Sequence, residues 1–284
     1  MEPYTNNTTG NHETPSQSAK RLLGKVAVIT GGARGIGAAT AKLFAENGAH
    51  VVIADVLDEL GATVAESIGG RYIHCDVSKE EEVESAIEEA VRWKGRVDVM
   101  VNNAGVLGPE GSITRLNMEE VNKVMSVNLM GTLHGIKHAA RAMVEGGTGG
   151  SIICTSSSAA IIGGLGSHEY TMSKAAVVGV VRSAACELGA KGIRVNCVLP
   201  HGVATEMLLV GYRRFWKADM TAEEVREEVG QRGSLLRGRG GTEEDVAHAS
   251  VFLASDESGF VTAHNLVVDG GYTSADSSLH FIYY

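Results

Sequence analysis

Short runs of β-branched residues alternate with longer segments of helical period from Lys25 onward, and this alternation limits the possible folds most strongly. Most of the runs are followed by a helical segment, which indicates βαβ units and a parallel sheet buried on both faces. With right-handed crossovers, the pattern predicts a doubly wound α/β fold with a seven-stranded parallel sheet and helices on both faces. The predicted strands are Val26–Thr30, His50–Ala54, Arg71–Cys75, Asp98–Val101, Ser151–Thr155, Arg194–Val198 and Asn265–Val268. The predicted helices are Ile36–Asn47, Leu57–Ser67, Lys79–Trp93, Met118–Val144, Glu169–Leu188 and Glu243–Ala254.

The chain contains no internal repeat and no linker-like segment, so residues 21–284 are expected to form one domain. Residues 1–20 are polar and lack the apolar core of a signal peptide, which predicts a disordered tail on a cytoplasmic protein. Residues 205–241 break the strand–helix rhythm with apolar residues mixed among charges. Because this stretch follows a strand, we interpret it as a helical flap over the ligand crevice of the sheet.

Composition excludes several classes of function. The formal net charge is −9, which disfavours nucleic acids and anionic membrane surfaces as partners. No apolar run approaches the roughly 18 residues that a membrane-spanning helix needs. The four cysteines are widely spaced without a CxxC pair, so the sequence predicts neither a disulfide framework nor a metal site.

A glycine-rich turn directly follows the first predicted strand. Glycines at 31, 35 and 37 permit a tight turn, close approach of backbone to a pyrophosphate and close packing of the next helix. The start of that helix directs free N–H groups toward the phosphates. Asp55 ends the second strand, about 20 residues further on, where a carboxylate can bind the ribose hydroxyls of a dinucleotide. The arrangement predicts a Rossmann-type site that prefers NAD, although Arg34 is a residue that could instead attract the phosphate of NADP.

Four spaced motifs resemble those of the short-chain dehydrogenase/reductase family. They are the turn Thr30-Gly-x-x-x-Gly35-x-Gly37, Asn102-Asn103-Ala104-Gly105, Ser157, and Tyr170-x-x-x-Lys174. Arg194-Val-Asn-Cys-Val-Leu-Pro200 and Val268-Asp-Gly-Gly271 are further landmarks, and the resemblance extends over residues 20 to 275. Within the family, the chain is similar to plant dehydrogenases of specialised metabolism that act on xanthoxin, secoisolariciresinol, borneol and isopiperitenol.

The residues themselves suggest the chemistry of alcohol oxidation. A base must take the hydroxyl proton, and a tyrosine with its ordinary pKa near 10 is a poor base at neutral pH. Lys174 lies one helical turn after Tyr170 and can favour the phenolate. Ser157 can stabilise the substrate oxygen, although only the spacing of the family motif selects it from the run Ser156–Ser158. The resemblance adds Asn128 as a fourth catalytic residue that supports a proton relay to the lysine.

The resemblance also implies which residues hold the cofactor. Asp76 and Val77 correspond to the contact with the adenine ring, although Asp76 could instead belong to the N-terminal cap of the next helix. Asn103, Ala104 and Gly105 correspond to the loop beside the adenosine. The full set of expected NAD contacts is Gly31, Arg34, Gly35, Ile36, Gly37, Asp55, Asp76, Val77, Asn103, Ala104, Gly105, Tyr170, Lys174, Pro200, Val203 and Thr205.

The substrate side is expected to be apolar. The residues expected to contact substrate are Ser157, Leu165, Tyr170, Met207, Tyr212, Phe215 and Trp216, although those of the flap could simply pack onto the body of the domain. The usual Pro-Gly of the family reads Pro200-His201 here, and we expect His201 to be a wall residue. Such a pocket suits a hydrophobic cyclic alcohol or its ketone, in first place a borneol-like terpenoid.

Other functions remain open at this level. A lignan or an alcohol of the abscisic-acid pathway is an alternative substrate. A redox-silent cyclase or isomerase that binds NAD, and a regulator that senses the NAD redox state, are alternatives to a dehydrogenase. The resemblance further implies a homotetramer, in which the helices Met118–Val144 and Glu169–Leu188 pack across a two-fold axis.

Overall fold

The sheet of the computed structural model, which describes residues 20–275, has seven parallel strands in the order β3-β2-β1-β4-β5-β6-β7. The strands are β1 (Val26–Thr30), β2 (His50–Asp55), β3 (Arg71–His74), β4 (Val99–Asn102), β5 (Gly150–Thr155), β6 (Ile193–Pro200) and β7 (Asn265–Val268). They match the predicted strands with shifts of at most two residues at their ends. The predicted fold class is therefore confirmed, while the predicted tail at residues 1–20 lies almost wholly outside the described residues.

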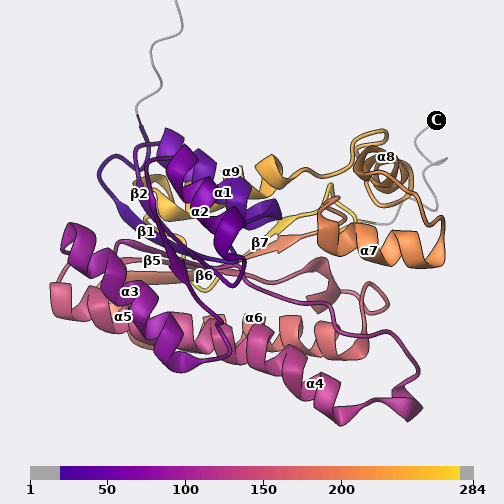
Figure 1. Cartoon of the computed structure of the whole chain (residues 1–284), viewed down its shortest axis with the longest axis horizontal. Helices are drawn as coiled ribbons and strands as arrows, with labels where there is room; N and C mark the ends of the chain where they lie inside the picture. Colours follow the sequence, from indigo (N-terminus) through magenta and orange to yellow (C-terminus); the bar gives the residue numbers. More distant parts are fainter. Residues whose placement is uncertain (1–19, 276–284) are drawn as a thin grey trace, which may run out of the picture.

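The helices cover both faces of the sheet (Figure 1). Those on one face are α1 (Gly35–Glu46), α2 (Asp58–Ser67) and α9 (Glu243–Ala254), and those on the other are α3 (Glu80–Lys94), α5 (Gly131–Gly146) and α6 (His168–Leu188). Successive residues of a strand point to opposite faces. In β1, Val26 and Val28 pack with α3, α5 and α6, whereas Ala27 and Ile29 pack with α1 and α9. This double burial explains why the strands read as continuous apolar runs.

One long predicted helix is interrupted in the structure. The segment expected as Met118–Val144 consists of α4 (Met118–Met125), a π-helical turn (Ser126–Met130) and α5. Apolar periodicity does not reveal such a turn, because it adds a single backbone residue without breaking the helix. The turn contains Asn128, so the deviation from regular helix occurs at a predicted catalytic position.

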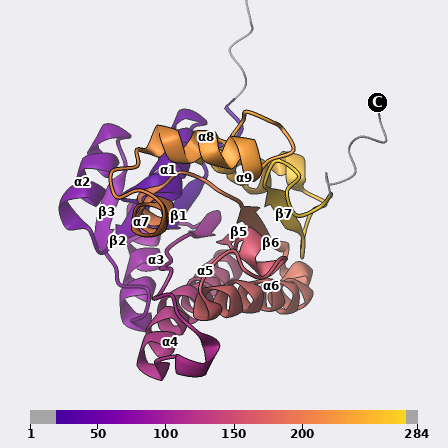
Figure 2. The same ribbon diagram turned by 90° about the vertical axis from the view of Figure 1, so that its right-hand side faces the viewer.

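The segment 205–241 contains two helices, α7 (Glu206–Phe215) and α8 (Ala222–Arg232). Thr221 caps α8 through a capping box with Glu224, and Leu209 of α7 packs with Met220 and Val225 in a small apolar cluster of its own. Figure 2 shows the end of the molecule where α7 and α8 lie on one side and α4 on the other. No helix within residues 20–275 is long and apolar enough to cross a membrane.

Candidate active site

A cavity of about 890 Å³ lies beyond the carboxyl ends of the strands, under α7 and α8. Strand order reverses between β1 and β4, and open α/β sheets bind ligands at such a point. The structure brings most of the predicted site residues to its wall: Gly31, Arg34, Gly35, Ile36, Asp55, Asp76, Val77, Asn103, Ala104, Gly105, Ser157, Leu165, Tyr170, Lys174, Pro200, Val203, Thr205, Met207, Tyr212 and Trp216. Gly37 and Asn128 lie behind that wall. Phe215 belongs to α7, but its side chain lies outside the described part of the chain.

The glycine-rich turn has no space for side chains at two of its positions. Gly31 has φ +64°, and a Cβ there would lie 2.8 Å from the Cα of Ala104. A Cβ at Gly37 would collide with the carbonyl oxygen of Gly31, so Gly37 serves the packing of α1 against the turn. The first turn of α1 has no acidic side chain, and Arg34 at its N-cap makes no capping hydrogen bond. Its free N–H groups and positive dipole end fit a pyrophosphate.

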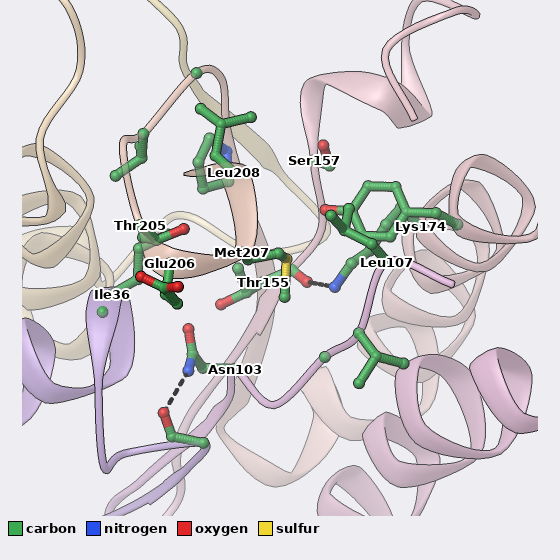
Figure 3. Close-up of a pocket in the computed structure, with 18 of the residues that line it drawn as sticks. Ile36, Asn103, Leu107, Thr155, Ser157, Lys174, Thr205, Glu206, Met207 and Leu208 are labelled. Carbon is green, nitrogen blue, oxygen red and sulfur yellow. Dashed lines mark hydrogen bonds between the residues drawn. The ribbon is translucent and has the colours of Figure 1, made fainter. Parts of the chain in front are cut away.

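Asn103 fixes the shape of this turn from the neighbouring strand. Its Nδ2 donates hydrogen bonds to the carbonyl oxygens of Thr30 and Gly31, both at 3.1 Å, and Figure 3 draws one of these bonds. Its backbone N–H donates to Oγ1 of Thr30 at 3.1 Å. These bonds join the end of β1 to the segment after β4, so both halves of the crevice keep a fixed spacing.

Asp55 is held rigidly at the end of β2. Its carboxylate accepts hydrogen bonds from the backbone N–H groups of Ala33, at 2.9 Å, and Leu57, at 3.0 Å, and the residue is only 7% exposed. Each carboxylate oxygen retains a further lone pair for a ligand hydroxyl. Arg34, in contrast, is exposed. The residues therefore fit the adenosine half of a dinucleotide, with a fixed anion where the ribose hydroxyls would bind.

Asp76 borders the cavity next to Val77. Its Oδ1 accepts hydrogen bonds from the backbone N–H of Ser78, at 3.0 Å, and from the Ser78 hydroxyl, at 2.7 Å. Burial opposes ionisation, but these bonds lower the pKa of Asp76 below its ordinary value. The N-cap of α3 is Lys79, so Asp76 is not the residue that caps this helix.

Tyr170 and Lys174 lie on one face of α6, one turn apart, opposite Ser157 at the end of the β5 segment. Ser167 is the N-cap of α6, where its hydroxyl accepts from the backbone N–H of Tyr170 and donates to the carbonyl of Leu107 at 2.7 Å. Nζ of Lys174 donates to the carbonyl oxygen of Thr155 at 2.8 Å and lies 5.7 Å from the centroid of the Tyr170 ring (Figure 3).

Burial dominates the electrostatics of this pair. It raises the pKa of Tyr170, and the hydrogen bond with the Ser157 hydroxyl only partly offsets the rise. Burial also lowers the pKa of Lys174 to about 8. The protein alone therefore does not supply a low tyrosine pKa, and added positive charge beside the phenol is needed to favour the phenolate.

Asn128 is fully buried in the π-helical turn. Its Oδ1 accepts from the backbone N–H of Val106 at 2.8 Å, and its Nδ2 donates to the Val106 carbonyl and to Oγ of Ser173, both at 2.9 Å. A Cβ added at Gly105 would lie 3.3 Å from both Oδ1 of Asn128 and Nζ of Lys174. Asn128 thus borders the lysine across a glycine, and its role in a proton relay stays a prediction.

The substrate half of the cavity contains residues that sequence reasoning missed. Leu107, Glu228, Val229, Arg232 and Tyr272 also line it. Tyr272 directly follows the Val268-Asp-Gly-Gly271 landmark, where Asp269 accepts hydrogen bonds from the backbone N–H groups of Gly271 and Thr273. Asp directly after a strand favours a turn, so Asp269 could have indicated that the chain turns at this point and brings Tyr272 to the cavity. His201 is a wall residue, as expected. Within residues 20–275, no group of His, Cys, Asp and Glu could hold a metal ion.

Comparison with known proteins identifies related chains. The family model described as "Enoyl-(Acyl carrier protein) reductase" matches residues 31–273. The chain is 63% identical over 270 residues to "Short-chain dehydrogenase reductase ATA1" of Arabidopsis thaliana, covering 94% of this chain and 99% of the relative. It is 46% identical over 272 residues to "Momilactone A synthase" of Oryza sativa subsp. japonica, covering 94% and 96%.

One more relative and a solved structure also match this chain over most of its length. "Sex determination protein tasselseed-2" of Zea mays is 45% identical over 303 residues, covering 97% of this chain and 90% of the relative. Among solved structures, a short-chain type dehydrogenase/reductase from Mycobacterium marinum superposes with a TM-score of 0.78 at 33% identity, covering 90% of this chain and 98% of that one.

Proposed function

The chain belongs to the short-chain dehydrogenase/reductase family of oxidoreductases, and we propose that it oxidises a secondary alcohol on a hydrophobic cyclic molecule, in first place a terpenoid, with NAD as acceptor. The observation that carries the proposal is the placement of Ser157, Tyr170 and Lys174 together on the wall of a cavity that continues under apolar residues of α7. The name of the rice relative, Momilactone A synthase, refers to synthesis of a small molecule and supports a small-molecule substrate for this chain.

The side chains of the protein perform the proton chemistry. Ser157 donates a hydrogen bond to the substrate oxygen and stabilises the negative charge that develops there. Tyr170 acts as general base in its phenolate form, which the Lys174 ammonium stabilises, and becomes the neutral phenol when it takes the hydroxyl proton. When bound, NAD would supply the acceptor for the hydride of the carbinol carbon and a positively charged nicotinamide ring. The raised pKa of Tyr170 explains why the tyrosine needs that additional positive charge before it can act.

The apolar half of the cavity suits an uncharged substrate better than an acyl carrier. Met207, Leu208 and Trp216 line it. The nearby basic pair is engaged with carboxylates, because Arg213 lies 3.5 Å from Glu206 and Arg214 lies 3.4 Å from Glu110. A phosphate-bearing arm would have to break these ion pairs. We therefore propose that the substrate is a free hydrophobic alcohol.

The test of the proposed function is turnover of a panel of cyclic secondary alcohols with NAD, including monoterpenols, a lignan alcohol and an abscisic-acid precursor. We expect at least one terpenoid alcohol to yield its ketone together with an equal amount of reduced NAD. A protein that binds NAD but oxidises no member of the panel would contradict the proposal.

The cofactor preference is predicted to favour NAD over NADP by about tenfold or more in kcat/KM. A 2′-phosphate would place negative charge beside Asp55, which two backbone N–H groups hold in place. At an effective dielectric constant of about 20, two unit charges 4 Å apart repel by roughly 4 kcal/mol, and a third of this energy already gives tenfold discrimination. Arg34 is exposed and can turn to solvent, so its attraction is the weaker effect.

The variant Asp55→Ser tests this balance of charges. It removes the repulsion and lets Arg34 contact the phosphate, so the preference for NAD should fall to near parity. The double variant Asp55→Ser with Arg34→Ala is the matched control, in which use of NADP should decline again. Equal use of both cofactors by the unaltered protein would contradict the prediction, because the attraction of Arg34 would then balance the repulsion by Asp55.

We also propose a homotetramer whose subunits pack through α5 and α6. The outward face of α6 exposes Met172, Ala175 and Gly179, and small residues allow close approach of a partner helix. Ala185 of the same helix packs inside the chain instead. Light scattering should give the mass of four chains, and Gly179→Arg should reduce it. A stable monomer at micromolar concentration would contradict the tetramer.

A further inference from the structure

Three polar side chains from different segments of the chain, those of Ser158, His201 and Tyr272, lie together on the wall of the cavity. His201 follows β6, Ser158 follows Ser157, and Tyr272 comes from the turn after β7. Nδ1 of His201 lies 2.9 Å from Oγ of Ser158, and its ring stacks on Tyr272 with a centroid distance of 4.2 Å and an interplanar angle of 7°. These two contacts therefore fix both the position of the imidazole and the orientation of its ring plane.

The hydrogen bond with Ser158 determines which nitrogen of His201 carries the proton. Ser158 is only 2% exposed, and its hydroxyl has no other hydrogen-bond partner within residues 20–275. If Nδ1 donated to this oxygen, the hydroxyl proton would be buried without an acceptor, which is unfavourable. The hydroxyl of Ser158 therefore donates to Nδ1. Burial lowers the pKa of His201, so its ring is neutral at pH 7 and Nε2 carries the proton.

His201 lines the cavity and also a smaller pocket next to it. Its Nε2 bonds to no residue within 20–275 and is not enclosed by protein atoms. A Cβ added at Gly233, which also lines the cavity, would lie 3.0 Å from Nε2, so the missing side chain at Gly233 leaves space beside this N–H group. Among mostly apolar surroundings, an oriented donor of this kind binds one acceptor atom.

This donor does not serve the oxygen that reacts. The hydroxyl groups of Ser157 and Ser158 interact with different residues. The hydroxyl of Ser157 faces Tyr170, and that of Ser158 faces His201. The acceptor at Nε2 is therefore a different atom of the ligand.

We propose that His201 is a specificity-determining residue that donates a hydrogen bond from Nε2 to a second, uncharged oxygen of the substrate, away from the carbon that is oxidised. The inference rests on the proposed oxidation of a hydrophobic cyclic alcohol and narrows that class to ring systems with an additional carbonyl, ether or ester oxygen. A substrate without this oxygen displaces water from Nε2 and leaves the N–H group unpaired.

The experiment compares two secondary alcohols with the same ring system, one of which carries a ketone or ether oxygen on another ring carbon. We expect the unaltered protein to favour the oxygenated alcohol by about tenfold in kcat/KM. The difference should appear in KM, because the hydrogen bond from His201 is made equally in the ground state and in the transition state. His201→Phe keeps an aromatic ring on Tyr272 without the donor and should bring the ratio close to one. Tyr272→Phe is the matched control, in which the ratio should persist.

Three results would overturn the proposal: a ratio near one in the unaltered protein, an unchanged ratio in His201→Phe, or a fall confined to kcat. If His201→Phe does not fold, Ser158→Ala replaces it, because loss of the donor to Nδ1 frees the proton to move there. An unchanged ratio of the two kcat/KM values in Ser158→Ala would also overturn the proposal. If neither alcohol is oxidised, the proposed function fails, and calorimetric binding of both alcohols to the NAD-loaded protein then decides, with equal affinities overturning the role of His201.

Discussion

Tyr170→Phe is expected to lower kcat by roughly 100- to 10,000-fold, the usual contribution of a general base, while NAD affinity changes little. The substitution removes the phenol that takes the substrate proton but leaves the glycine turn, Asp55 and Lys174 in place. The phenylalanine fits the same buried space, so the thermal unfolding temperature should stay close to that of the unaltered protein. Steady-state turnover and fluorescence titration with NAD measure the two quantities separately.

Two outcomes would contradict the role of Tyr170. Retention of more than about a tenth of kcat would mean that another group takes the proton. A parallel loss of NAD binding would mean that the tyrosine is needed for the cofactor site rather than for chemistry.

Lys174→Ala should damage both turnover and cofactor binding, with kcat reduced by at least about 100-fold. Nζ lies 5.7 Å from the Tyr170 ring centroid, and its positive charge favours the phenolate. The pKa of Lys174 is lowered to about 8, so most of the lysine is still protonated at neutral pH. The resemblance to the family implies that the same group would also hold the nicotinamide ribose, which is the reason for the expected loss of cofactor binding.

The variant Lys174→Met is the matched control for this substitution, because it keeps an unbranched apolar stem and removes only the charge. If the charge is what matters, Met and Ala should lose activity to the same extent. Activity restored in the Met variant would show that Lys174 serves packing, and an unchanged NAD affinity in both would contradict its second role.

The fold could be predicted because its two main sequence signals, apolar strands and helix ends, each depend on residues that are close together in the chain. Continuous apolar strands such as Val26–Thr30 result from burial on both faces, and helix ends are marked by residues such as Gly95, which has φ +76° after α3. The π-helical turn at Ser126–Met130 leaves no such mark in the sequence, and Asn128 in it bonds to Val106 and Ser173, which are distant in sequence.

The residues of the candidate site also fall into those that the sequence predicts and those that it does not. Residues that line the cavity near the glycine-rich turn, such as Gly31 and Asp55, belong to motifs whose spacing follows from one strand–helix–strand unit. The wall of the substrate half is assembled from α8 and the turn at Tyr272, which meet only after the chain has folded. The sequence also does not reveal that burial raises the pKa of Tyr170, because that depends on how completely α6 covers the ring.

The most direct test of the account is a single-turnover experiment with protein in excess over a terpenoid alcohol and with saturating NAD. Rapid mixing, followed by the absorbance of reduced nicotinamide and by chromatography of the organic product, measures both halves of the redox reaction. We predict one reduced NAD and one ketone for each alcohol consumed, at a rate that Tyr170→Phe lowers by at least about 100-fold. Conversion of the alcohol to an isomer or a cyclised product without reduced NAD would contradict the assignment as a dehydrogenase.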